Sequence, residues 1–464
     1  MKISLHFAAS PFDNISSLPM GIGYLASYIE KNIPEGKIDI AENEEVIFKS
    51  NPDLLGISAS SATYNKAVAI SQRIKKELNI PIIIGGCHIT SLPESLNRCF
   101  SLGILGEGEE TFAELIKIFL SKNSFEPEKL ENVSGICFWQ KDGGLKINKR
   151  RPLIKNLDTL PFPKMLIYKP VKTIPLMTSR GCIFDCLFCS SKKHWGRYRQ
   201  FSSQRVIEEI KHLARNFRPQ CIDIIDDLFV MDKERLKNIV EGIKDFAKEH
   251  KIIFKCLVHA NLVDEEVIFL LKKGNFKIIR FGAETGSERM LNIMKRGTAK
   301  VSDSQRLIDL CQKYRIQVGG SFMFGFPGEK EEDLRETYRF LKKNRKQFFI
   351  DGCYLATSFP GTALWELSLK QGIISKNNNW DRLVCEIERN DFNWNNIIYL
   401  NPSLPFEKFI KIVENFKKEF TDKKRRNLVF RTHFKKIFIF IFGKKCFLEL
   451  RDIFEKRNKK WLIF

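Results

Sequence analysis

The sequence has no long hydrophobic run, no secretory leader pattern and no disulfide-type spacing of its cysteines. Near the C-terminus the longest purely apolar run covers only residues 437–442, whereas a membrane-spanning helix needs roughly 20 apolar residues. The chain begins at Met1 with an alternating strand pattern and not with a signal peptide. Most of the 12 cysteines lie singly along the chain, which is typical of a reducing compartment. We therefore expect a cytoplasmic protein.

Negative charge is in short supply. The 77 Lys and Arg residues outnumber the 55 Asp and Glu residues, which gives a formal net charge of +22. Such an excess attracts nucleic acid, an anionic membrane surface or anionic substrates. Lysine is frequent along the whole chain, so we interpret the charge mainly as compositional, except at the C-terminus. With 464 residues, of which 43% are hydrophobic, the chain is long enough for about three folded domains.

Three cysteines are clustered in residues 178–191, TSRGCIFDCLFCSS: Cys182, Cys186 and Cys189. Thiolate is the ligand that iron–sulfur clusters use. Three thiolates cannot fill the four corners of a four-iron cluster, so one iron is left open to another ligand. A structural zinc site is the alternative, and it needs a fourth ligand, for which His194 is the candidate close by.

An α/β domain is predicted for residues 1–125, where short β-branched runs alternate with helical periodicity. This order favours a Rossmann-like parallel sheet with helices on both faces. Ligands of such sheets bind beyond the carboxyl ends of the strands. The expected strand ends are residues 58–60, 85–86 and 106–108.

A second α/β unit is predicted after a connector. Residues 126–170 are expected to form this connector, with a hairpin and then a proline-containing linker. From residue 171 to about 370, strands and helices alternate again. This pattern predicts a partial (β/α)6 TIM-like barrel whose functional residues lie at the carboxyl ends of its strands. The cysteine run follows the first strand, so all these ends are expected to meet at one mouth.

The C-terminal region, residues 371–464, lacks this alternation and is expected to be helical. Residues 406–420 have an amphipathic pattern, and aromatic residues then interleave with Lys and Arg up to Trp461. A basic amphipathic stretch can lie on an anionic membrane, which would make the protein membrane-associated. A helical cap on the barrel explains the same pattern.

The cysteine spacing, with Phe188 directly before the last cysteine, resembles the signature of the radical S-adenosylmethionine (SAM) enzymes. The resemblance covers residues 171 to about 370. In that family three cysteines hold a 4Fe-4S cluster, and the open iron of the cluster binds SAM. An electron from the cluster then cleaves SAM into methionine and a 5′-deoxyadenosyl radical. The resemblance implies that Cys182, Cys186 and Cys189 are metal ligands and catalytic residues. It further implies SAM contacts at Phe188, Asp226, Asp227, Glu284, Phe324 and Gly325.

The sequence itself qualifies this resemblance at three places. Adjacent residues of a strand point to opposite faces, so at most one of Asp226 and Asp227 is expected to face SAM. Glu329 ends the segment GSFMFGFPGE, and it either belongs to the site or only starts a helix. His259 stands where the family pattern has an arginine, which leaves the role of that strand open.

The pieces LPMGIGYLASYIE, PDLLGISAS, IIIGGCHITSLPE and GILGEGEETF resemble the cobalamin-binding domain that precedes many radical SAM cores. The loop SPFDNISSLPMG lacks the histidine of the Asp-x-His-x-x-Gly motif, so the resemblance is to the subgroup whose cobalt has no such ligand. His88 is expected near the nucleotide tail of the cofactor, or else as a helix cap. The implied cobalamin-binding residues are Ser58, Ser60, Gly85, Gly86, His88, Gly106, Glu107 and Gly108.

Together these resemblances imply a cobalamin-dependent radical SAM enzyme, similar to the class B radical SAM methyltransferases and to the anaerobic Mg-protoporphyrin monomethyl ester cyclases. Methyl transfer to an unactivated carbon is the main expectation, and oxidative cyclisation or rearrangement on the same scaffold is the alternative. A radical RNA-modifying enzyme is disfavoured, because Cys87, Cys99 and Cys137 have no cluster-like spacing. A peripheral membrane protein without chemistry is disfavoured by the intact cysteine trio.

The expected partners follow from the same resemblance. They are a small-molecule substrate and a low-potential electron donor of the flavodoxin or ferredoxin type. The basic, aromatic tail favours a lipid-like substrate. Nucleic acid is not an expected partner.

Overall fold

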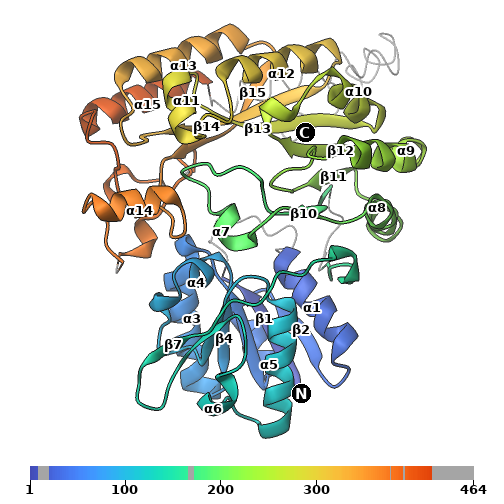
Figure 1. Ribbon diagram of the computed structural model, residues 1–464, viewed down its shortest axis with the longest axis vertical. Coiled ribbons are helices and arrows are strands. Elements are labelled where there is room, and N and C mark those ends of the chain that lie inside the picture. Colours follow the sequence, from blue (N-terminus) through green and yellow to red (C-terminus); the bar gives the residue numbers. More distant parts are fainter. Residues whose placement is uncertain (9–19, 166–171, 377, 390–391, 421–464) are drawn as a thin grey trace, which may run out of the picture.

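Two β-sheets organise the chain, and they lie one above the other in Figure 1. The structure is a computed structural model and describes residues 1–8, 20–165, 172–376, 378–389 and 392–420. The apolar run 437–442 and the basic, aromatic tail 421–464 lie outside the described residues, so the membrane prediction for the tail stays a prediction. Among the described residues, no helix has both the length and the hydrophobicity needed to cross a membrane.

The first sheet has seven strands in the order β2-β1-β3-β4-β5-β6-β7, of which β1 to β5 are parallel. Its strands are β1 (Lys2–Phe7), β2 (Lys37–Ala41), β3 (Leu54–Ser58), β4 (Ile82–Gly85), β5 (Leu102–Ile104), β6 (Ile136–Trp139) and β7 (Leu145–Ile147). Its helices are α1 (Met20–Asn32), α2 (Glu44–Ser50), α3 (Tyr64–Leu78), α4 (Cys87–Ser91), α5 (Glu109–Lys122) and α6 (Pro127–Leu130). Short β-branched strands buried on both faces are what a sheet covered by helices requires.

The hairpin β6–β7 is present as predicted, but it belongs to the first sheet and not to a separate connector. β6 pairs antiparallel with β5, and its residues Ile136 and Phe138 are buried in the core of this sheet. An unpaired edge at β5 would expose its backbone hydrogen-bonding groups, so the hairpin protects it. The first sheet therefore continues past residue 125.

The second sheet has six parallel strands in the order β15-β14-β13-β12-β11-β8 and forms the predicted partial barrel. Its strands are β8 (Thr173–Leu176), β11 (Cys221–Ile224), β12 (Ile253–Val258), β13 (Phe276–Glu284), β14 (Gln317–Phe324) and β15 (Phe348–Leu355). The helices between and after them are α8 (Ser203–Phe217), α9 (Lys233–Glu249), α10 (Glu265–Lys273), α11 (Glu288–Met294), α12 (Val301–Lys313), α13 (Glu331–Asn344) and α14 (Ala363–Lys370). A two-stranded ribbon, β9 (Ser179–Arg180) with β10 (Arg199–Gln200), and the short helix α7 (Ser191–Trp195) flank the cysteine run.

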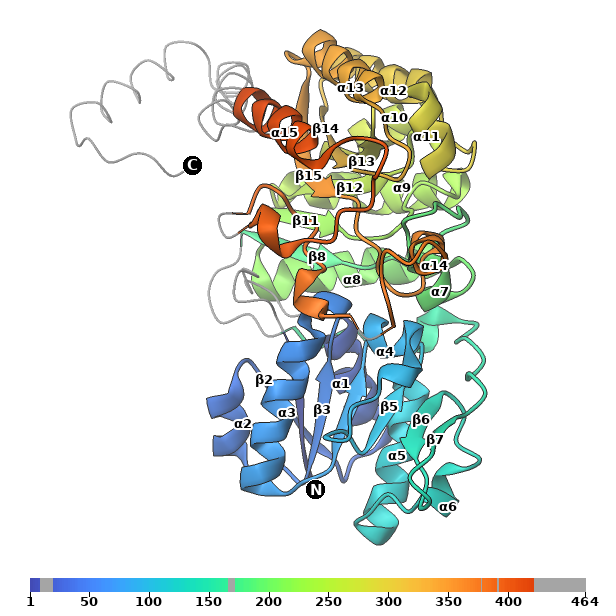
Figure 2. The ribbon, with the colours of Figure 1, turned by 90° about the vertical axis from the view of Figure 1, so that its left-hand side faces the viewer.

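The described part of the C-terminal region serves both sheets. Trp380, in a short 3₁₀ helix, returns to the first sheet and packs with Tyr64 and His88, at centroid distances of 6.4 and 4.6 Å. Helix α15 (Phe406–Phe420) has the predicted amphipathic pattern and lies against the barrel (Figure 2), where Phe416 meets Phe324 at 4.7 Å. The region is therefore a strap across both parts and not only a cap on the barrel.

The packing of α15 predicts a large cost for deleting one side chain. Phe409 is fully buried, and its ring lies 4.9 Å from that of Tyr399. We expect Phe409→Ala to lower the free energy of unfolding by about 3–5 kcal/mol. The matched variant Phe406→Ala removes a ring from the same helix that is only partly buried, so its cost should be smaller. Denaturant unfolding of both variants tests this, and equal costs would contradict the packing.

Candidate active site

The cysteine loop follows strand β9 and ends at α7, which lies at the junction of the two parts (Figure 1). The backbone N–H of Phe184 donates to Cys182 Sγ at 3.4 Å, and that of Ser191 donates to Cys189 Sγ at 3.5 Å. A turn closes the loop, because Cys189 N donates to Cys186 O at 3.1 Å. The loop thus presents three thiols with N–H groups already directed at two of the sulfurs.

Burial is the main influence on the pKa values of the thiols in the loop. Burial raises the pKa of Cys186 to about 12 and that of Cys189 to about 11, and the neighbouring cysteines act in the same direction. Such thiols lose their protons only when a metal takes their place. Within the described residues, no group of three or more His, Cys, Asp or Glu side chains is arranged to hold a single metal ion. Three thiols within one short loop, with N–H donors to two of the sulfurs, fit a cluster that takes three of its ligands from the chain.

The two acidic residues after β11 have different partners. The strand ends at Ile224, so Asp226 and Asp227 lie in the following loop and not on the strand where they were expected. Asp226 is buried and accepts hydrogen bonds from Thr178 N and Thr178 Oγ1, both at 2.5 Å, and from Ser179 Oγ at 2.7 Å. Asp227 accepts from Ser191 Oγ at 2.5 Å and raises the pKa of Cys189, though less than burial does.

Asp226 therefore fixes the segment that enters the cysteine loop. Of the two aspartates, Asp227 is the one that interacts with the loop of the cysteines. The strand argument, by which at most one of the two faces SAM, does not apply to residues of a loop. The contact itself stays a prediction.

Glu284 and Lys295 form a buried ion pair beside the cysteines. Glu284 ends β13 with φ +61°, and its Oε1 lies 3.5 Å from Lys295 Nζ. Lys295 also donates to Gly282 O at 2.7 Å. Burial raises the pKa of Glu284, and the Lys295 ammonium opposes this shift. Sequence reasoning singled out Glu284 but missed Lys295, because nothing in the local pattern marks a lone lysine after α11 as buried.

His259 contacts the cysteine loop directly. Its ring stacks on Phe184 with centroids 3.9 Å apart, and its Nδ1 lies 2.6 Å from Asn261 Oδ1. Burial lowers the pKa of His259 to about 4, so the ring is neutral near pH 7. Its Nε2 is buried without a hydrogen-bond partner among the described residues. This nitrogen is the polar group that stands where the family pattern has an arginine.

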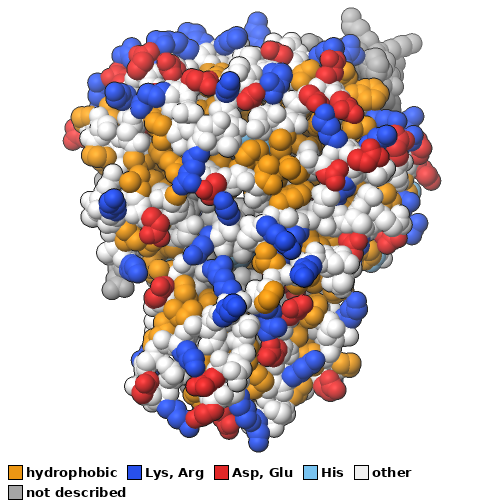
Figure 3. Space-filling model, viewed as in Figure 1, with side chains coloured by type: hydrophobic (Ala, Val, Ile, Leu, Met, Phe, Trp, Pro, Cys, Tyr) orange, Lys and Arg blue, Asp and Glu red, His pale blue; other side chains and the backbone are white. Residues whose placement is uncertain are grey.

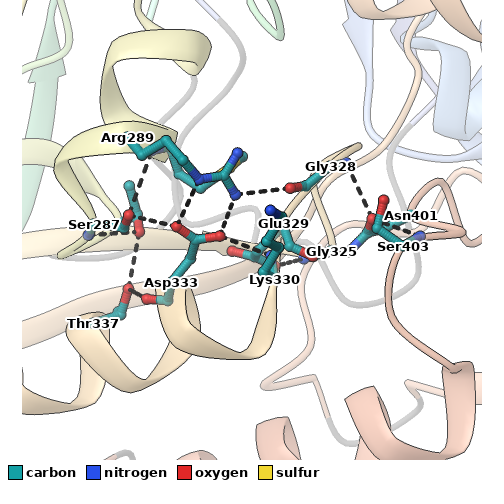
Figure 4. Close-up of polar contacts among 12 residues, drawn as sticks. Ser287, Arg289, Gly325, Gly328, Glu329, Lys330, Asp333, Thr337, Asn401 and Ser403 are labelled. Atoms are coloured by element: carbon teal, nitrogen blue, oxygen red, sulfur yellow. Dashed lines mark hydrogen bonds and ion pairs between the residues drawn. The ribbon is translucent and has the colours of Figure 1, made fainter.

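The segment after β14 is held by Glu329 (Figure 4). Gly325 N donates to Glu329 Oε2 at 2.7 Å, whereas Glu329 Oε1 has no partner among the described residues. Asn401 bridges the same turn, because it accepts from Gly328 N and donates to Glu329 O. The backbone of Phe324 and Gly325 was expected along the adenine, and the Phe324 ring packs in the core against Phe416. Only its backbone is thus left for that role, and Glu329 fixes the turn before α13 without lying in the helix.

A cavity of about 140 Å³ lies at the carboxyl end of the first sheet, beneath α1 and α5. Six of the predicted cobalamin-binding residues line it: Ser58, Gly85, Gly86, Gly106, Glu107 and Gly108. A Cβ atom added to Gly85 or Gly106 would meet no atom within 4 Å, so both glycines keep the slot open. Gly86 has φ +100°, and a Cβ there would lie 2.5 Å from Ala59 O, so this turn requires glycine. These residues fit the tail of a large cofactor.

Two of the predicted cobalamin-binding residues do not line this slot. Ser60 caps a 3₁₀ turn, and its N–H donates to Thr63 Oγ1 at 3.0 Å. His88 is fully buried, and its ring nitrogens lie 3.0 Å from Ser61 Oγ and 3.0 Å from Ser95 Oγ. Burial lowers the pKa of His88 to about 3. The structure thus places His88 in the core under Trp380, and its expected position near the nucleotide tail has no support in the geometry.

The slot is closed on its other side by the segment that carries the cysteines. Met177, Arg180, His194 and Trp195 line the same cavity. His194, the fourth ligand of the zinc alternative, packs edge-on against Trp195 at 4.5 Å, and its Nδ1 has no hydrogen-bond partner among the described residues. Glu107 is not free to bind a cofactor through its carboxylate, because both oxygens accept from arginines.

Comparison with known proteins identifies the class of both parts. Residues 176–341 match the radical SAM superfamily, and residues 17–116 match the B12 binding domain. An uncharacterized methyltransferase of Pyrococcus horikoshii is 33% identical over 380 residues, which cover 77% of this chain and 79% of the relative. The chain therefore belongs to the cobalamin-binding radical SAM family.

One further relative and one solved structure extend the comparison. The anaerobic magnesium-protoporphyrin IX monomethyl ester cyclase of Rubrivivax gelatinosus is 25% identical over 349 residues, covering 70% of this chain and 62% of the cyclase. The fold resembles that of the radical SAM methyltransferase TsrM from Kitasatospora setae, with a TM-score of 0.65 at 16% identity, covering 80% of this chain and 76% of TsrM.

These comparisons confirm the family, the two-part fold and the cofactor set predicted from the sequence. The protein is a radical SAM enzyme of the methyltransferase-like kind, and its cofactors are a 4Fe-4S cluster, SAM and cobalamin. A small-molecule substrate and a reductant are consistent with this class. The roles of the individual site residues other than those contradicted above stay predictions.

The buried carboxyl of Glu329 predicts a pH dependence of stability. Burial raises its pKa to about 8, against the smaller opposite effect of the Gly325 N–H. The folded state keeps the proton that an unfolded chain releases near the ordinary value of 4.5. The resulting stabilisation is complete below about pH 4.5 and is lost as the pH rises through about 8.

Glu329→Gln copies the protonated form at every pH. We expect the difference in unfolding free energy between wild type and this variant to change by about 1 kcal/mol per pH unit from pH 6 to 8. Denaturant unfolding across this range measures it, with Glu332→Gln on the exposed face of α13 as the control. Parallel curves for wild type and Glu329→Gln would show that the carboxyl is already ionised.

The open space at Gly85 predicts a variant that fills the slot without disturbing the fold. Gly85→Leu should weaken cobalamin binding at least tenfold, equivalent to about 1.4 kcal/mol. The smaller Gly85→Ala serves as the graded control, and its effect should be weaker. A spectroscopic titration with cobalamin measures affinity, and circular dichroism checks folding. Unchanged affinity of a folded Gly85→Leu chain would place the cofactor elsewhere.

Proposed function

We propose that this enzyme methylates an unactivated carbon of a small molecule, with SAM at the cysteine loop and cobalamin in the slot of the first sheet. One observation carries the proposal: a single cavity is lined by the glycine turns of the first sheet and by His194 and Trp195, which follow the cysteines. Two cofactors that act on one substrate must lie within reach of the same carbon. The shared junction supplies that arrangement.

The cofactors supply the chemistry, and the chain supplies placement and exclusion of water. When bound, the cluster with SAM supplies a radical that removes a hydrogen, and cobalamin supplies the methyl group. In this proposal the three cysteines hold the cluster, and Asp227 and Glu284 offer carboxylates near it. The stacked rings of Phe184 and His259 form a wall beside the same loop. The neutral Nε2 of His259 is then available to hydrogen-bond SAM or substrate.

The reductant is proposed to be an acidic protein of the flavodoxin or ferredoxin type. Lys and Arg side chains gather over the junction of the two parts in Figure 3. Arg150, Lys192 and Lys193 line a cavity of about 350 Å³ there, next to the cysteine loop. A positive surface attracts an acidic donor and orients its approach. A cytoplasmic location is proposed from the same requirement for a low-potential donor.

The finer substrate class rests on the sequence pattern of the tail. The basic, aromatic residues 421–464 suggest contact with an anionic membrane and hence a lipid-like substrate.

Oxidative cyclisation is the second candidate, because a cyclase is among the relatives of the chain. The two outcomes differ in one product. Methyl transfer consumes a second SAM and releases S-adenosylhomocysteine, whereas cyclisation transfers no methyl group and releases none. Both reactions are compatible with the two domains of this chain, so only analysis of the products distinguishes them.

The anaerobically reconstituted enzyme should therefore release 5′-deoxyadenosine and S-adenosylhomocysteine together. Cys186→Ala should lower 5′-deoxyadenosine formation by at least about 100-fold, because one corner of the cluster loses its ligand. Cys385→Ala, which removes a partly buried thiol far along the chain, is the matched control and should keep activity. Chromatography of both nucleosides measures the outcome. Product formation with no S-adenosylhomocysteine would replace methyl transfer by cyclisation.

A further inference from the structure

Four buried charged side chains join the two parts of the molecule: Arg180, Arg199, Glu107 and Glu109, here called the Arg180 cluster. Arg180 Nη1 lies 2.6 Å from Glu107 Oε1, and Arg180 Nη2 lies 2.6 Å from Glu109 Oε1. The Arg180 side chain is 2% exposed and both carboxylates are 5% exposed. Arg199 Nη1 lies 2.8 Å from Glu107 Oε2. Two positive and two negative charges are thus balanced out of water.

The two sides of the cluster come from different parts of the chain. Arg180 and Arg199 are paired across the β9–β10 ribbon that flanks the cysteine loop. Glu107 lies between Gly106 and Gly108 in the slot, and Glu109 is the first residue of α5. Arg180 is also two residues before Cys182. One guanidinium therefore links the glycine turn of the cobalamin slot to the start of the cysteine loop.

The surroundings fix the orientation of both arginines. The Arg180 Cζ atom lies 5.2 Å from the ring centre of Tyr24 and 5.1 Å from that of Trp195. Arg199 also donates to Ile154 O at 2.9 Å and to Trp195 O at 3.0 Å. Burial raises the pKa of Glu107, but the two arginines outweigh burial and hold it below its ordinary value. The Glu107 carboxylate therefore stays charged near pH 7.

A planar guanidinium binds two carboxylates in few relative orientations, so such a cluster is directional. Removal of one partner of a buried ion pair is also strongly destabilising, because the other partner stays charged and unpaired. By contrast, Lys164 of the linker pairs with Glu30 of α1 through side chains that are 35% and 42% exposed. Exposed pairs of that kind hold geometry weakly.

We propose that the Arg180 cluster is the joint that sets the position of the cobalamin slot relative to the cysteine loop. Its residues are positioning residues, which act through the two cofactor sites and not on the reacting atoms. The consequence for coupling between the two cofactors rests on the proposed methyl transfer. The consequence for the junction itself does not.

The test uses the full chain with four variants. Arg180→Gln breaks the joint and leaves two glutamates short of a partner. The double variant Arg180→Gln with Glu109→Gln removes a charge from each side, so it keeps the chain folded if the single variant does not. Glu109→Gln completes the cycle. Glu209→Gln is the control, because Glu209 is equally buried and pairs with Arg205 within the single helix α8.

Hydrogen exchange of the cobalamin-loaded and cobalamin-free chain is the first readout. We expect exchange of residues 107–115 and 179–200 to rise at least tenfold in Arg180→Gln and in the double variant, and to stay at the wild-type rate in Glu209→Gln. Exchange in β13 and β14 should not change in any variant. Wild-type exchange at the junction in the folded double variant would overturn the proposal.

The second readout is the number of methylated products formed per 5′-deoxyadenosine released. We expect this ratio to fall at least fivefold in Arg180→Gln and in the double variant, because radicals form while the methyl donor is misplaced. An unchanged ratio with altered exchange would overturn the positioning role. If wild type itself forms no methylated product, the proposed function fails, and the exchange readout still decides whether the joint exists.

Discussion

The need to pair every buried charge shapes the junction between the two sheets. Carboxyl ends of parallel strands meet there, and they carry acidic residues into a region that excludes water. An unpaired carboxylate in such surroundings is costly. Asp226 is therefore hydrogen-bonded by Thr178 and Ser179, and Glu284 is paired with Lys295. Polar residues that the sequence marks as candidates for cofactor binding thus also hydrogen-bond or pair with other residues of the site and stabilise its structure.

This constraint separates what the sequence could predict from what it could not. The strands and helices follow from local patterns: β-branched runs such as residues 82–84 and the amphipathic repeat of residues 406–420 are visible without any partner. The cysteine trio is equally local, because its spacing lies within eight residues. These features were predicted and are present.

Features that depend on distant partners were missed. His88 was expected near a cofactor, but it is enclosed by Tyr64 and by Trp380, which is far away in sequence. Glu107 was expected to line the slot as a ligand, and its carboxylate is occupied by Arg180 and Arg199. The hairpin at Ile136 was expected in a connector, because nothing in its own residues shows that β5 needs a partner at its edge. Each of these facts is a tertiary contact that one sequence does not encode locally.

Two kinds of contact hold the two parts together, and they differ in how strongly they fix orientation. On one side of the junction, Trp365 of α14 and Trp380 of the C-terminal strap pack into the apolar core of the first sheet. Apolar contact is strong but hardly directional, so it keeps the parts together without fixing their register. On the other side, the Arg180 cluster is directional because a guanidinium fork accepts few geometries.

Two cofactors that must reach one carbon need a defined geometry, to which a directional contact contributes more than apolar packing does. An uncharacterized methyltransferase and a cyclase both match this chain, over 77% and 70% of its length. The reaction outcome must therefore depend on how the junction places its cofactors and substrate. The directional contact beside Cys182 is where that placement is set.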